Sequence, residues 1–138
     1  MARKPSKPNA AYVAANKQWL KEKAKEEGVK SLEKGLLYKE IDKGEEGGKQ
    51  PTAVDVVSVY YEGWLTDGSK FDSCLLGAPM ACRLRDLIEG WVIGLQHMHV
   101  GDRWELYVPS ELGYGNISQP GIPAGSTLIF RVTLVGVV

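Results

Sequence analysis

Residues 87–95, LIEGWVIGL, decide the fold that we expect for this chain. Larger apolar residues recur there at positions i, i+1, i+4, i+5 and i+8, which places them on one wide stripe of a helix: Leu87, Ile88, Trp91, Val92 and Leu95. Two glycines inside the stretch, Gly90 and Gly94, each cost roughly 1 kcal/mol of helix propensity relative to alanine. Such a weak helix is stable only where other parts of the chain pack around it. Trp91 is then either ordinary core or the floor of a ligand pocket.

The sequence on both sides of this stretch has the patterns of β-strands. Apolar, β-branched and aromatic runs predict four strands, over residues 36–41, 54–61, 104–108 and 127–138. The Asp67-Gly68 pair is a hairpin signal, and a return segment begins at residues 71–73. We expect a loop over residues 73–81 and a packed flap over residues 109–126, which are rich in glycine and proline. This order of elements predicts an α+β fold in which an antiparallel sheet curves against the short helix.

Composition sets limits on partners and compartment. The 138 residues are enough for one domain with an appendage. Lysine and arginine together number 17, as do aspartate and glutamate, so no global charge favours nucleic acid or a membrane surface as a partner. We expect residues 1–8, with two prolines and three basic residues, to be a flexible basic arm. Because no apolar segment follows them, we do not expect a secretory signal. Two cysteines, Cys74 and Cys82, are too few for a disulfide framework, and we expect a cytoplasmic protein.

Residues 9–30 form a separate N-terminal helical extension in our interpretation. Asn9 is a candidate N-cap and Gly28 a candidate residue just past the helix end, with Ala, Lys and Glu dominating between them. Apolar side chains, among them Trp19, form only a narrow stripe on this helix. The stripe predicts docking, either on the helix's own domain or on a second copy in a dimer.

Acid–base and metal chemistry find little support in the sequence. There is no Gly-x-Ser-x-Gly elbow, and the two histidines, His97 and His99, end the central helix without nearby metal ligands, so we expect them to be solvated. What remains is an aromatic set with one carboxylate beside it: Tyr61, Phe71, Trp91, Tyr114, Phe130 and Asp72. Such a set is either core or an apolar ligand site with a few polar tips.

Seven short motifs nevertheless stand together in a familiar order. They are residues 59–63 (VYYEG), 67–68 (DG), 71–73 (FDS), 87–91 (LIEGW), 100–102 (VGD), 111–115 (ELGYG) and 122–130 (IPAGSTLIF). Over residues 36–138 the chain resembles the FKBP family of peptidyl-prolyl cis-trans isomerases, and residues 27–38 resemble its bacterial branch that includes macrophage infectivity potentiators. The resemblance implies a twisted antiparallel sheet wrapped around a short central helix. It also implies isomerisation of X-Pro bonds without cofactor or metal, proline-containing polypeptides as partners, and macrolides as a further ligand class.

The resemblance also assigns roles to individual residues. It makes Trp91 the floor of a proline pocket, and Tyr61, Phe71 and Phe130 its walls. Leu87 and Ile88 form the rim, the Ile88 N–H faces a ligand carbonyl, Tyr114 offers its hydroxyl, Asp72 hydrogen-bonds at the edge, and Ile122 belongs to the binding set. Cys82, with Met80 as the alternative, occupies a position where familiar members have Phe. Leu112 replaces an aromatic residue, and Gln119 a frequent His.

Overall fold

The computed structural model describes residues 9–44 and 46–138, so the arm expected over residues 1–8 lies outside the described part. Within these ranges the chain forms two α-helices and seven strands, in this order: α1 Ala10–Lys23, β1 Val29–Ser31, β2 Leu37–Asp42, β3 Val56–Leu65, β4 Lys70–Cys74, β5 Met80–Arg83, α2 Glu89–Leu95, β6 Arg103–Val108 and β7 Leu128–Val137. Short 3-10 turns precede β2 and α2 and begin the flap.

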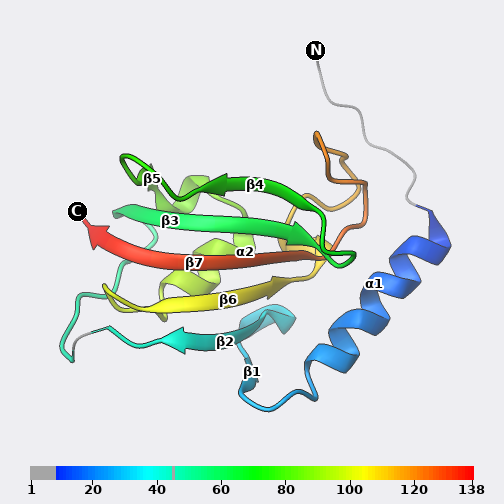
Figure 1. Ribbon diagram of the computed structural model, residues 1–138, viewed down its shortest axis with the longest axis horizontal. Coiled ribbons are helices and arrows are strands. Elements are labelled where there is room, and N and C mark those ends of the chain that lie inside the picture. Colours follow the sequence, from blue (N-terminus) through cyan, green and yellow to red (C-terminus); the bar gives the residue numbers. More distant parts are fainter. Residues whose placement is uncertain (1–8, 45) are drawn as a thin grey trace.

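All strand pairs are antiparallel, in the order β1-β2-β6-β7-β3-β4, and β5 also pairs with β3. The two longest strands, β3 and β7, lie at the centre, and α2 lies behind the sheet (Figure 1). The α+β fold with a short central helix against an antiparallel sheet is therefore confirmed, as is the N-terminal helix.

The central helix packs closely against β6 because its glycines leave room. Gly90 and Gly94 are buried together with Trp91 and Leu95. A Cβ on Gly90 would lie 2.6 Å from a methyl group of Val108. A Cβ on Gly94 would lie 2.9 Å from a methyl group of Leu106. The lost helix propensity is thus offset by burial of the apolar side chains that the sheet presents.

Other boundaries differ from expectation. The segment 73–81 is not all loop, because β4 continues to Cys74 and β5 begins at Met80. The long strand β3 explains this, since β5 pairs with residues 56–59 of β3 and β4 with residues 61–64 on the same edge. Helix α1 ends at Lys23, and Gly28, at φ +85°, instead leads into β1. The chain leaves the helix before Gly28 because residues 29–31 pair with β2 as strand β1.

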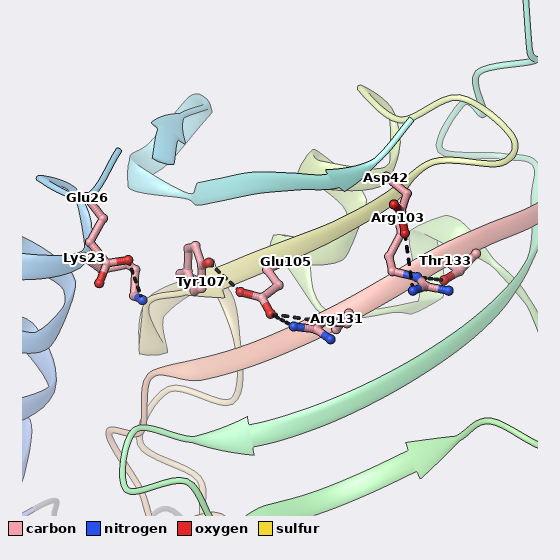
Figure 2. A network of polar contacts seen from close by, with 8 residues as sticks. All are labelled: Lys23, Glu26, Asp42, Arg103, Glu105, Tyr107, Arg131 and Thr133. Atoms are coloured by element: carbon pink, nitrogen blue, oxygen red, sulfur yellow. Dashed lines mark hydrogen bonds and ion pairs between the residues drawn. The ribbon is translucent and has the colours of Figure 1, made fainter. Parts of the chain in front are cut away.

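Helix α1 docks on its own domain. Its predicted N-cap is confirmed, because the Asn9 side chain accepts a hydrogen bond from the Tyr12 N–H. The Trp19 ring lies 5.8 Å from the ring of Tyr107 in β6, and the Lys23 ammonium lies about 5 Å from both rings. Figure 2 shows how the outer face of the sheet continues from there, with Tyr107 donating to Glu105. A row of cross-strand polar contacts completes this face: Glu105 to Arg131, and Arg103 to Asp42 and Thr133.

Candidate active site

A cavity of about 360 Å³ lies between the inner face of the sheet, the start of α2 and the flap. Its lining consists of Tyr61, Phe71, Asp72, Met80, Leu87, Ile88, Trp91, Tyr114, Gln119, Pro120, Ile122 and Phe130. A cavity of this size, mostly apolar with a few polar groups, is typical of a small-ligand site.

The floor and walls of the cavity are four aromatic rings in edge-to-face contact. Trp91, which is 4% exposed, lies 5.2 Å from the rings of both Tyr61 and Phe130, at interplanar angles of 84° and 89°. Phe71 meets Phe130 at 5.5 Å and 90°. Such pairs are favoured by the ring quadrupoles and hold each other's orientation. Because three strands and α2 supply these rings, the regular elements of the fold fix the floor.

The wall rings Phe71 and Phe130 can pack against β3 because residue 63 is a glycine. Gly63 is buried in the middle of β3, and a Cβ there would lie 2.7 Å from Phe71 and 3.0 Å from Phe130. Glycine inside a strand often marks such a close approach. Gly63 stands inside the quoted motif of residues 59–63, but the motif alone does not indicate this close approach.

The polar groups of the cavity are two phenols around one carboxylate. Tyr61 donates a hydrogen bond of 2.6 Å to Asp72, whose other oxygen accepts the Ser73 N–H. Burial and this hydrogen bond raise the pKa of Tyr61 far above its ordinary value of 10.0. Burial, with a smaller effect of the Asp72 charge, also raises the pKa of Tyr114. Both phenols therefore stay protonated at neutral pH and act as hydrogen-bond donors, not as bases.

Two further donors belong to the floor and rim. The Ile88 N–H makes no hydrogen bond to any other described residue. The Nε1–H of Trp91 is buried without a partner within residues 9–44 and 46–138. An unpartnered buried donor costs about 1–3 kcal/mol, and such exceptions concentrate at functional sites.

The structure brings together every predicted site residue except Cys82. Met80 lines the cavity in its place. In the register of β5, Met80 stands opposite Val59 and Cys82 opposite Val57, so Cys82 lies one same-face step, about 7 Å, further along the strand. Leu112 is 4% exposed and belongs to the core, whereas Gln119 faces the cavity. Pro120 also lines the cavity and was missed.

Both histidines lie outside the cavity. His97 contacts Glu33 at 2.9 Å, and His99 lies beside Asp102 at 3.6 Å; neither histidine lines the cavity. Within the described ranges, no group of three or more potential ligands is arranged to hold a metal ion. The same residues contain no helix long and apolar enough to cross a membrane.

Comparison with known families agrees with this geometry. Residues 47–135 match the model of the FKBP-type peptidyl-prolyl cis-trans isomerase, and residues 1–39 match the domain found amino-terminal to it. The chain belongs to the FKBP-type peptidyl-prolyl cis-trans isomerase family. Its aromatic cavity is thus in the domain that defines the family, and α1 falls in the amino-terminal one.

Three relatives show how far the similarity extends. The isomerase FkpA of Aeromonas hydrophila is 43% identical over 95% of this chain and 46% of its own length. The isomerase Mip of Coxiella burnetii is 41% identical over 92% of this chain and 52% of its own length. A crystal structure of a peptidyl-prolyl cis-trans isomerase from Pseudomonas syringae superposes with a TM-score of 0.87 at 33% identity, covering 96% of this chain and 97% of that one. The chain spans about half the length of the curated relatives it matches.

Proposed function

We propose that this chain catalyses cis–trans isomerisation of X-Pro peptide bonds in polypeptides. The observation that carries the proposal is the edge-to-face aromatic cavity with Trp91 as its floor, in a domain of the FKBP family. The Tyr114 hydroxyl and the unpaired Ile88 N–H are available as donors to a carbonyl, whereas the Tyr61 hydroxyl is already bonded to the Asp72 carboxylate.

The chemistry needs no base. Rotation about an amide has a barrier of about 18–20 kcal/mol, because resonance must be broken, and X-Pro isomerisation takes roughly tens to hundreds of seconds. The planar amide is more dipolar than the twisted one, so an apolar floor disfavours the planar form relative to the twisted form. Binding the twisted amide more tightly lowers the barrier.

The donors at the edge have complementary tasks. The Ile88 N–H and the Tyr114 hydroxyl hold carbonyl groups of the substrate, which fixes the chain on both sides of the rotating bond. Tyr61 is tied to Asp72 and keeps its ring upright against Trp91. We assign no proton transfer to any of these groups.

The decisive experiment follows cis-to-trans relaxation of a panel of X-Pro peptides. We expect Trp91→Ala to lower kcat/KM at least tenfold. The matched control is Trp64→Ala, because Trp64 lies outside the cavity lining and meets Lys70 instead. Relaxation at the uncatalysed rate with the unmodified chain, or an undiminished rate with Trp91→Ala, would refute the proposal.

A second candidate function is a binding or chaperone module with little turnover. Met80 and Gln119, at the edge of the cavity, depart from the family pattern and favour it. Macrolide binding that competes with peptide but is not accompanied by catalysis would identify this function. We place it second because the four rings of the floor and walls are complete.

Oligomeric state and cellular compartment are further proposals. Trp19 is engaged on its own domain, which favours a monomer or a weak dimer over an assembly built on α1. Sedimentation at micromolar concentration tests this, since a stable dimer at that concentration would count against it. The cytoplasmic location stays a prediction; two free cysteines are consistent with a reducing compartment, and fractionation of cells tests it.

A further inference from the structure

Two buried polar side chains, Asn16 and Ser126, and the half-buried Tyr12 link α1 to the end of the flap. Asn16, at 2% exposed, accepts the Thr127 N–H at 2.8 Å with its Oδ1 and donates to the Tyr12 carbonyl at 2.8 Å with its Nδ2. Exchanging the two amide atoms would set donor against donor and acceptor against acceptor, so this orientation is the one that satisfies both partners. The hydroxyls of Tyr12 and Ser126 lie 2.7 Å apart.

The direction of this last hydrogen bond is fixed by its neighbour. Ser126 donates its single hydroxyl hydrogen to the Pro123 carbonyl at 2.6 Å. Ser126 therefore accepts from Tyr12, and a relay runs from the Tyr12 hydroxyl through Ser126 to Pro123. Pro123 directly follows Ile122, which lines the cavity.

Backbone hydrogen bonds hold the rest of the flap together. Gln119 and Ile122 form a reciprocal pair of 2.9 Å backbone hydrogen bonds around a Pro120-Gly121 turn. One further bond, from the Gly125 N–H to the Gly115 carbonyl at 2.8 Å, ties the two sides of the flap together. The segment 119–126 is thus bounded on one side by the cavity and on the other by α1.

We propose that α1 is a positioning element of the catalytic site, in which Tyr12 and Asn16 set the place of the flap residues 119–126 that close the cavity. This inference rests on the proposed function. Neither residue touches the substrate; they act through Ser126 and Thr127 on Ile122. Docking of α1 at its other end, through Trp19 on β6, is a separate contact.

The test compares two conservative aromatic substitutions on the same helix. Tyr12→Phe removes the hydroxyl relay and keeps the ring, whereas Trp19→Phe keeps the relay and alters the contacts with Tyr107 and Lys23. Asn16→Ala is the stronger variant, because it leaves the buried Thr127 N–H without its partner. Amide exchange of Ile122 and Gly125 reports flap opening, and the shift of the Ile122 methyl signal on titration with an X-Pro peptide gives a Kd that requires no turnover.

We expect Tyr12→Phe to accelerate exchange at Ile122 and Gly125 roughly fivefold, and Asn16→Ala roughly tenfold or more. Both should raise KM and the peptide Kd several-fold with little change in kcat, while Trp19→Phe changes none of these. Unchanged flap exchange overturns the inference, and so does faster exchange with an unaltered Kd. A chain that never catalyses refutes the proposed function alone, because exchange and Kd still decide the role of α1.

Discussion

Replacing Gly63 by alanine should fill part of the cavity from its own wall. Gly63 stands opposite Asp72 on one side and Phe130 on the other. The new Cβ would lie 2.7 Å from Cζ of Phe71, whereas carbon atoms in contact are normally about 3.5–4.0 Å apart. The Phe71 ring must therefore move, and the free space beside it is the cavity.

The expected size follows from two opposing effects. Overpacking costs about 1–3 kcal/mol, and alanine recovers about 0.5–1 kcal/mol because the unfolded chain loses freedom. The net loss is about 0–2.5 kcal/mol, or up to roughly 9 °C in the unfolding midpoint for a domain of this size. Displacement of Phe71 into the cavity should also lower kcat/KM about tenfold, since the space needed by the proline ring shrinks.

Gly136→Ala in β7 is the matched control. The nearest atom to a Cβ there is that of Ser58 at 4.0 Å, so the substitution meets no obstacle and should be neutral or slightly stabilising. Urea unfolding and peptide relaxation on both variants give the comparison. If the Gly63→Ala protein is as stable and as active as the Gly136→Ala protein, the close approach of the wall rings is not what the site requires.

Three further outcomes are expected. Met80→Ala should change KM and the preference for the residue before proline in the peptide panel, while Cys82→Ala leaves both unaltered; equal effects would contradict the assigned placement of β5. The isomerase rate should be flat between pH 6 and 8, because the pKa values of Tyr61 and Tyr114 are raised and both stay protonated there; a titration in that range would reveal an unassigned ionisable group. Burial raises the pKa of Glu105, but hydrogen bonds from Tyr107 and Arg131 outweigh it and leave this pKa below its ordinary 4.5. Its stabilising effect is therefore complete at neutral pH and fades as pH falls through the folded value. Glu105→Gln should cost about 1 kcal/mol at pH 7 by urea unfolding, and the difference from the unmodified protein should shrink in acid.

Hydrophobic periodicity and residue propensity predicted where the helices and strands lie, but not which contacts stabilise them. The stripe at residues 87–95 predicted the central helix, yet Leu87 and Ile88 precede α2 and lie at the cavity rim. The buried face instead contains Gly90 and Gly94, which helix propensity alone counts as destabilising. Whether they stabilise the fold depends on how closely α2 packs on β6, and the local sequence does not determine that distance.

The same limit explains the errors at strand edges. The four residues of β5 form a strand because β3 is long enough to pair with both β4 and β5. The sequence of residues 73–81 does not by itself predict this pairing. Cys82 was expected in the cavity, where the structure has Met80, for a related reason: one same-face step along β5 decides which side chain lines the cavity. The aromatic floor was predicted only through the family resemblance, whose motifs contain it residue by residue; the residues alone left core and ligand pocket open.

The site divides into a fixed part and an adjustable part. Trp91, Tyr61 and Phe130 lie on α2 and the central strands, where the rings orient one another and the sheet allows little displacement. The flap lies at the edge, with Ile122 and Gln119 held by a short turn and by the contacts of α1. Catalysis by differential binding depends on the apolar floor, so changes there should act on kcat/KM for every peptide. Changes in the flap, β5 or α1 should instead redistribute affinity among peptides, because these parts meet the residues on either side of the proline.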